Sequence, residues 1–211
     1  MELTLGKTLT GRPFSRPGAR AERLARWVSG TLTPPMCAAA AATAVAAHGG
    51  TAAAWGWAAL LIAVGVLLPT GYTLYLHRSG QLSDLHMNVR RERRRPLAAS
   101  AASAAMALGL LWAGGAGPLP VIVAAVWTAQ SLLFFGVTLR WKISAHCSGC
   151  AGLAVLCGWL YGSGVLVLLA LVPLVAWSRV FLRRHTLGQT LAGTAAGCAT
   201  WLPALAGLPA L

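Results

Sequence analysis

Long apolar stretches alternate with short polar ones along most of the chain. The apolar stretches cover about residues 27–48, 52–76, 97–114, 120–139 and a last one that runs to about 206, with two shorter arms at 147–161 and 164–178. A helix that crosses a bilayer needs about 20 apolar residues, each adding ~1.5 Å of length. The pattern therefore predicts an all-α fold, a polytopic transmembrane helix bundle of about six to seven spans.

The composition also favours a membrane protein over a soluble one. Of the 211 residues, 57% are hydrophobic and only 10% are charged, whereas a soluble domain carries about 25% charged residues. Such a chain has too little polar surface to face water on all sides. The five cysteines lie mostly within apolar stretches, which indicates buried thiols and not a disulfide framework.

Positive charge is confined to alternate loops. All 17 Lys and Arg residues fall in the tail at 1–26 or in the segments 77–96, 140–149 and 178–185. By the positive-inside rule, these segments share the cytoplasmic side. We therefore expect a basic cytoplasmic tail at 1–26 and a transmembrane helical domain at 27–211. Topology and anionic ligands account for the charge, so nucleic acid is not expected as a partner.

The three internal polar segments carry residues suited to phosphate chemistry. The first holds the arginine cluster that ends at Pro96, the second holds Ser144 and His146, and the third runs from Ser178 to Gln189. Guanidinium groups offer forked donors to phosphate oxygens, and imidazoles serve as nucleophiles or proton donors. Alone, each segment is an ordinary basic loop or an interfacial histidine, but their conjunction on one membrane side favours a phosphate site.

The third segment resembles the last motif of the type 2 phosphatidic acid phosphatase superfamily, Ser-Arg-x5-His-x3-Asp. Ser178, Arg179 and His185 match it, and Gln189 stands where the family has Asp. The resemblance covers about residues 77–205. Within it, the stretch at 83–96 is similar to a divergent bacterial branch of the superfamily.

The other two family motifs are matched in part. In Pro-Ser-Gly-His, Ser144 and His146 match, while Ile143 and Ala145 replace Pro and Gly. In Lys-x6-Arg-Pro, Arg95 and Pro96 fit the end, but Asn88 occupies the Lys position. Another register of this motif makes Arg90 and Arg93 the key arginines.

The resemblance implies a catalytic mechanism and its residues. His185 would attack phosphorus to form a phosphohistidine, and His146 would protonate the leaving oxygen. Gln189 would take the place of the Asp that orients the nucleophile, and Asp84 is a candidate substitute, or else an ion-pair partner of the arginines. The phosphate would be bound by Arg90, Arg93, Arg95, Ser144 and Arg179. The implied substrate is a lipid phosphate or an isoprenyl diphosphate in a bacterial plasma membrane, bound without a metal or another cofactor; the oligomeric state stays open.

Three alternatives remain open at this point. The same site could ionise an isoprenoid diphosphate for terpene cyclisation or prenyl transfer. It could also be a degenerate, non-catalytic binder of lipid phosphates. Finally, His146, Cys147 and Cys150 could bind a metal ion, but a clear fourth ligand is missing, which favours small residues at the start of a tightly packed helix.

Overall fold

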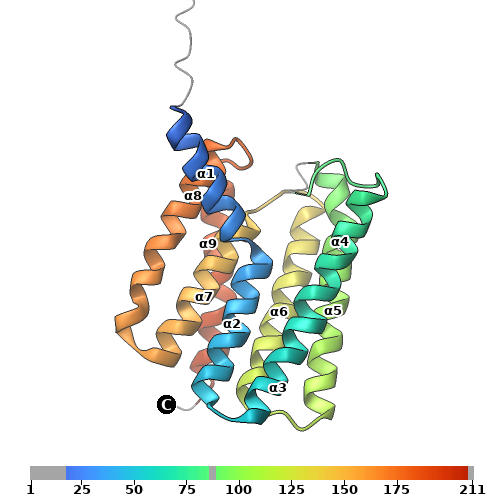
Figure 1. Ribbon diagram of the computed structural model, residues 1–211, viewed down its shortest axis with the longest axis vertical. Helices are drawn as coiled ribbons and strands as arrows, with labels where there is room; N and C mark the ends of the chain where they lie inside the picture. The colour runs from blue at the N-terminus through green and yellow to red at the C-terminus, as the bar shows by residue number, and fades with distance from the viewer. Residues whose placement is uncertain (1–17, 86–88, 209–211) are drawn as a thin grey trace, which may run out of the picture.

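The computed structural model describes residues 18–85 and 89–208, and all regular structure in this part of the chain is helical. Asn88 and most of the basic tail lie outside the described residues. From α2 onward the helices run alternately away from and toward the end of the bundle that carries α1 (Figure 1). This arrangement confirms the expected all-α helical bundle.

The helices follow one another closely along the chain. Their bounds are α1 (Ala19–Thr31), α2 (Pro34–Gly49), α3 (Ala52–Leu60), η1 (Leu61–Leu67), α4 (Leu68–Arg78), η2 (Arg90–Arg93), α5 (Arg94–Ala113), α6 (Pro118–Thr138), α7 (Ala145–Tyr161), η3 (Ser163–Ala170), α8 (Leu171–Phe181) and α9 (Leu187–Ala206). Here η1 is a π-helical stretch, and η2 and η3 are 3-10 helices.

Four helical stretches in the described residues are long and apolar enough to cross a membrane. They are Ala52–Arg78, Arg90–Ala113, Pro118–Thr138 and Ser163–Phe181. The chain is therefore a membrane protein by the length and composition of its helices. The helices α2 and α7, with 16 and 17 residues, fall short of the usual crossing length. The number of six to seven spans stays a prediction.

The start of the first apolar helix differs from the sequence prediction. We expected a span from residue 27, but α1 continues through that position to Thr31 and a separate helix begins at Pro34. Pro34 and Pro35 explain the break, because proline fits the first helical turn and disfavours helix in the residue before it. Thr33 then caps α2 by accepting a hydrogen bond from the Met36 N–H at 3.4 Å. Helix α1 therefore runs across the expected boundary at residue 26, and the division into a basic tail and a helical domain stays a prediction.

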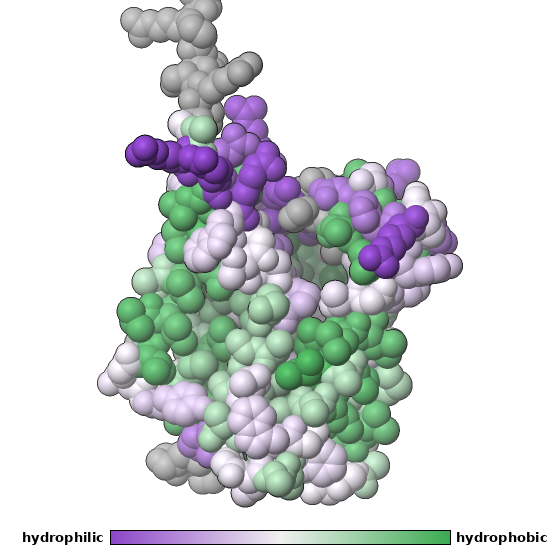
Figure 2. Space-filling view, in the orientation of Figure 1, coloured by the Kyte–Doolittle hydropathy of each residue, from purple (hydrophilic) through white to green (hydrophobic). Residues whose placement is uncertain are grey.

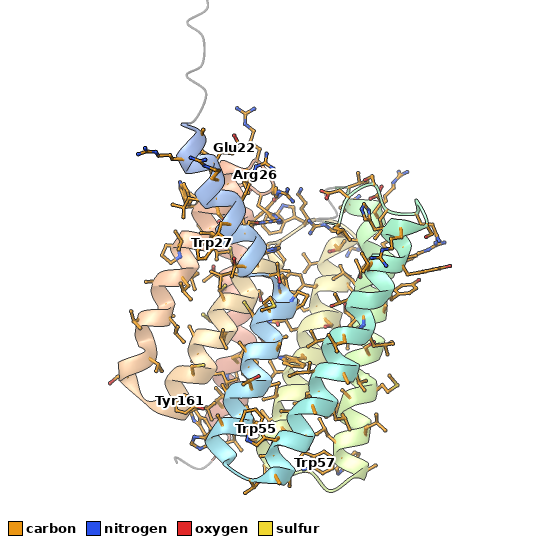
Figure 3. The ribbon with its side chains drawn as sticks, viewed as in Figure 1. Glu22, Arg26, Trp27, Trp55, Trp57 and Tyr161 are labelled. Atoms are coloured by element: carbon orange, nitrogen blue, oxygen red, sulfur yellow. The ribbon has the colours of Figure 1, made fainter. Side chains whose placement is uncertain are left out.

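The two ends of the bundle differ in polarity. The loops that follow α4, α6 and α8 lie at the end that carries α1, and the hydrophilic residues gather there (Figures 1 and 2). Trp27 lies at this end, while Trp55, Trp57 and Tyr161 lie at the opposite end (Figure 3). Aromatic side chains at both ends are typical of membrane–water interfaces. We call the end with α1 the polar end.

Glycines allow α9 to pack tightly against α7, and this contact positions the candidate site. A Cβ atom added at Gly193 would lie 2.3 Å from the Ser144 carbonyl oxygen, and one at Gly197 would lie 2.5 Å from that of Ser148. Small residues at such positions let helix backbones approach closely within membranes. The start of α7 is thereby held against the first turns of α9.

Candidate functional site

Helices α5, α7 and α9 all begin at the polar end, and each is preceded by one of the three segments singled out in the sequence. Arg93, Ser144 and Thr186 are the capping residues at these starts. A helix start presents unpaired backbone N–H groups and a partial positive charge, which together attract anions. The fold therefore places three helix N-termini, each with a partial positive charge, at the polar end of the bundle.

Basic side chains converge between these helix starts. Arg93, Arg179 and His185 are 8%, 1% and 6% exposed, and Lys142 is half-buried. Burial lowers the pKa of His185 to about 3, and the positive charges of Arg179, Arg93 and Lys142 act in the same direction, whereas the hydrogen bond with Gln189 opposes them. We call Arg93, Lys142, Arg179 and His185 the cationic cluster.

Lys142 is the member of the cationic cluster that the sequence prediction missed. Its pKa is lowered by burial and, secondarily, by the charges of Arg93 and Arg179. It lies two residues before Ser144 in the segment between α6 and α7. Its position next to the second motif is the signal in the sequence that could have identified it. The sequence analysis includes Lys142 only among the charges of the basic segment 140–149.

Arg179 is a buried cation with an unsatisfied donor. Its Nη1 donates to Ser29 Oγ at 2.7 Å, while its Nε has no hydrogen-bond partner among the described residues. Asp84 lies within electrostatic range of this guanidinium group. A buried polar group without a partner is costly, and a buried charge is more so. An anion bound in the cationic cluster would supply the missing acceptor.

The turn between α8 and α9 holds His185 between two helix caps. At the end of α8, the Arg183 N–H donates to the Val180 carbonyl and the Arg184 N–H donates to the Arg179 carbonyl, each at 2.9 Å. This is the Schellman pattern, in which one residue adopts a left-handed conformation. Arg183 takes that position, with φ of 53°. His185 follows two residues later, and Thr186 then caps α9.

The hydrogen bonds of Gln189 define the tautomer of His185. Gln189 Oε1 lies 3.2 Å from the backbone nitrogen of Thr186 and 3.0 Å from His185 Nδ1. The Thr186 N–H can only donate, so the shared Gln189 atom is the carbonyl oxygen, which can only accept. His185 Nδ1 therefore carries the proton, and Nε2 keeps its lone pair. Gln189 thus lies in hydrogen-bond contact with His185, at the position that the resemblance gives to the orienting residue, and its role in catalysis stays a prediction.

Ser144 and His146 open α7 beside this pair. The Ser144 N–H donates to the Gln189 carbonyl at 3.0 Å, which ties the second segment to the third. The Ser144 side chain accepts from the Cys147 N–H at 3.4 Å, so its oxygen caps the helix. His146 is half-buried in the first turn of α7.

Two of the expected phosphate-binding arginines have contacts elsewhere. Arg90 Nη1 donates to the Leu139 carbonyl at 2.8 Å, and Arg95 Nη1 donates to Gln81 Oε1 at 2.7 Å. Both arginines are exposed. Of the arginines proposed in residues 90–95, the structure brings Arg93 into the cationic cluster and leaves Arg90 and Arg95 at the surface.

The acids of the first segment have separate roles. Asp84 interacts electrostatically with Arg179, and the Nδ1 of His185 is occupied by Gln189. The Nδ1 position at which a substitute orienter would act is thus taken by Gln189, and both roles expected for Asp84 stay predictions. Glu92 Oε2 accepts hydrogen bonds from the Ser83 N–H and hydroxyl at 3.1 and 2.9 Å, which organises the loop after α4.

The possible metal site at the start of α7 does not assemble. Across residues 18–85 and 89–208, His, Cys, Asp and Glu side chains form no group of three or more that could hold a metal ion. Cys150 Sγ instead lies 3.6 Å from Cys37 Sγ of α2, and both thiols are buried. These cysteines serve helix packing.

Comparison with known proteins gives no relative. The chain matches none of the protein-family models, none of the curated proteins and none of the solved structures with which it was compared.

Proposed function

We propose that the protein is a membrane-embedded phosphatase that hydrolyses a lipid phosphate or an isoprenyl diphosphate, with His185 as its nucleophile. The observation that carries this proposal is the tautomer of His185. Its Nε2 lone pair is available, and it belongs to a cluster with two buried arginines. The resemblance of the three polar segments to the type 2 phosphatidic acid phosphatase superfamily points to the same reaction.

Each step of the proposed reaction has a residue to perform it. The Nε2 lone pair of His185 attacks phosphorus, and the bond from phosphorus to the leaving oxygen breaks as His146 donates a proton to that oxygen. Water then attacks the phosphohistidine, gives its proton to His146 and releases phosphate. Arg93 and Arg179 stabilise the charge on the transferred oxygens. Gln189 keeps the imidazole in its attacking tautomer.

A phosphoenzyme assay tests this proposal. The purified protein is incubated with a panel of lipid phosphates and isoprenyl diphosphates labelled with ³²P at the terminal phosphate. We expect an acid-labile, base-stable label on the protein and release of inorganic phosphate, both lost in His185→Ala. His48→Ala, a matched change at the opposite end of the bundle, should keep both. Phosphate release without any dependence on His185 would contradict the assignment.

We also propose the membrane arrangement of the chain. It would cross the membrane six or seven times, with the polar end in the cytoplasm, because all basic loops lie there. Ser79 and Ser163 are exposed and belong to opposite ends of the bundle, so Ser79→Cys and Ser163→Cys form a matched pair. A membrane-impermeant maleimide added to intact cells should label the cysteine at 163 and spare that at 79. The reverse result would invert the orientation.

Ionisation of an isoprenoid diphosphate is the second candidate. Gln189 favours it, because a neutral amide stabilises the imidazolium of a phosphoryl-transfer reaction less than a carboxylate does. In that reaction the carbon–oxygen bond breaks and diphosphate leaves as an anion held by the cationic cluster. Cyclised or transferred organic products that persist in His185→Ala, with no phosphoenzyme, would favour this candidate. Binding without any product would indicate a non-catalytic lipid-phosphate binder.

A further inference from the structure

The N-terminal helix α1 reaches the candidate site through one serine. Helix α1 packs along α8, and its buried face consists of Ala25, Val28 and Ser29. Ser29 is 2% exposed and Arg179 of α8 is 1% exposed. Their contact, Arg179 Nη1 to Ser29 Oγ at 2.7 Å, joins residues 150 positions apart in the chain.

The Ser29 contact leaves one edge of the Arg179 guanidinium group for a ligand. A guanidinium group binds phosphate best through two parallel N–H groups on one edge. Ser29 holds Nη1, while Nε lies on the opposite edge beside Nη2. The same Nε has no partner among the described residues. The hydrogen bond from Nη1 to Ser29 therefore fixes the orientation of the guanidinium plane. It leaves the edge formed by Nε and Nη2 available to a ligand.

We infer that Ser29 is a positioning residue that orients Arg179 for bidentate contact with the phosphate of the substrate. This inference rests on the proposed function, because it assigns the phosphate to the cationic cluster. Ser29 touches no substrate in this role and acts through Arg179 alone. Helix α1, which lies outside the segments that resemble the phosphatase superfamily, thereby becomes part of the site.

Charge repulsion explains why Arg179 needs such a partner. The positive charges of Arg184 and Arg93 act on Arg179, which in turn acts on Lys142, and Asp84 is an acid within electrostatic range of Arg179. Without the serine hydroxyl, Nη1 would lose the acceptor that holds the guanidinium group in place against this repulsion. In the empty site the guanidinium group of Arg179 would then lack a fixed orientation. Part of the binding free energy of the substrate would be needed to reorient it, which would weaken binding.

Substitutions at Ser29 test the inference in the full-length protein. Ser29→Ala removes the acceptor, Ser29→Cys keeps the side-chain volume but weakens the acceptor, and Ser29→Thr retains the hydroxyl. Ser103→Ala, at a buried serine of α5, is the matched control. The readouts are kcat and KM for the substrate found in the panel, the affinity for inorganic phosphate measured by thermal shift, and the melting temperature without ligand.

We expect Ser29→Ala and Ser29→Cys to lower kcat/KM by about tenfold to a hundredfold, the range for a hydrogen bond to a charged group. The affinity for inorganic phosphate should fall in parallel, because the orientation of Arg179 matters before any chemistry. Ser29→Thr should recover most of both values, and Ser103→Ala should change neither. Unchanged kcat/KM and phosphate affinity in Ser29→Cys, with or without a change in melting temperature, would overturn the inference.

The two readouts separate failure of the inference from failure of the proposed function. If the wild-type protein binds inorganic phosphate but hydrolyses nothing, the phosphatase proposal fails and the affinities of the Ser29 variants alone decide. If the wild-type protein binds neither inorganic phosphate nor pyrophosphate and hydrolyses nothing, both proposals fail together. If it hydrolyses a substrate and the Ser29 variants behave like Ser103→Ala, only the role of Ser29 is rejected.

Discussion

Gln189 Oε1 lies 3.0 Å from His185 Nδ1, so an amide accepts the proton of the imidazole that we propose as the nucleophile. The two residues lie one turn apart at the start of α9. An amide orients the ring as a carboxylate would, but it adds no negative charge to favour the imidazolium. Burial and the surrounding cations therefore dominate, and they lower the pKa of His185 to about 3.

The first prediction concerns the protonation of His185. In protein labelled with ¹⁵N-histidine in detergent micelles, the resonances of His185 should report the tautomer protonated at Nδ1. They should not titrate between pH 5 and 8, because the pKa is about 3. Comparison of spectra with those of His185→Gln assigns the signals. A titration midpoint near the ordinary value of about 6.5, or a proton on Nε2, would contradict the geometry.

The same pKa predicts how stability depends on pH. Above pH 6.5 His185 is neutral in both the folded and the unfolded chain. As the pH falls below 6.5, the unfolded chain binds a proton at this residue and the folded chain does not, so the unfolding free energy decreases by up to about 1.4 kcal/mol per pH unit. Melting temperatures at pH 7.5, 6.5 and 5.5 should decline less in His185→Gln than in the wild type. If the melting temperature depended on pH equally in the wild type and in His185→Gln, His185 would not be the cause of the pH dependence.

Replacement of the amide by a carboxylate tests its part in catalysis. Gln189→Glu keeps the reach of the side chain and its role in the cap of α9, where a glutamate is also well suited. The added charge should raise the pKa of His185 and stabilise the imidazolium that forms in phosphoryl transfer. We expect phosphate release to rise by about tenfold or more, a small part of the ~10⁴ effect of the reverse change in serine proteases. The pre-steady-state rate of phosphoenzyme formation measures it.

The outcome of this substitution also discriminates between the two candidate reactions. Gln81→Glu, at an exposed glutamine in the loop after α4, controls for the added charge. If Gln189→Glu lowers phosphate release while Gln81→Glu does not, phosphohistidine chemistry is not in use. Diphosphate ionisation would then explain why a neutral residue occupies position 189.

Much of the fold could be predicted because it depends on local pattern. The apolar stretches at 52–76 and 120–139 match Ala52–Arg78 and Pro118–Thr138 within about two residues. The break before Pro34 was missed because Ser29, Gly30 and Thr31 were included in one apolar span that starts at residue 27. Proline chemistry decided that boundary, and hydropathy did not.

The site was predictable only as far as its residues carry motifs. His185, Arg179, Ser144 and Gln189 were singled out because their spacing resembles a known family, and the structure places them at one end of the bundle. Ser29 could not be found, since its contact with Arg179 depends on the packing of α1 against α8 and leaves no sequence signal. The choice of one arginine within residues 90–95 likewise depends on how η2 turns into α5.

Among the arginines of the first segment, we expect Arg93 to contribute strongly to kcat/KM and Arg90 and Arg95 to contribute little. Arg93 is 8% exposed within the cationic cluster, whereas Arg90 and Arg95 are exposed and bind Leu139 and Gln81. Arg93→Ala should lower kcat/KM by about a hundredfold, because a charge-assisted contact to the transferred phosphate is lost. Arg90→Ala and Arg95→Ala should each change it by less than about threefold. Equal losses in all three variants would mean that the segment acts through its net charge.

Arg183 offers a test of the turn that presents His185. A non-glycine residue in the left-handed region costs about 1–2 kcal/mol, and Arg183 adopts φ of 53° with an exposed side chain. Glycine removes that cost but gains about 0.5–1 kcal/mol of freedom in the unfolded chain. Arg183→Gly should therefore raise the unfolding free energy slightly, by about 0.5–1 kcal/mol, and increase the melting temperature.

Arg184→Gly is the matched control for this change, because Arg183 is the non-glycine residue with positive φ among the described positions. At that position glycine relieves no left-handed strain and brings the entropic loss, and it also removes a half-buried cation whose charge acts on Arg179. The melting temperature should therefore not show the rise expected of Arg183→Gly. Phosphate release by Arg183→Gly should stay near that of the wild type, since the Schellman hydrogen bonds to Val180 and Arg179 use backbone atoms alone. A fall in stability with a parallel loss of activity would mean that the Arg183 side chain itself supports the turn, and that the position of His185 depends on it.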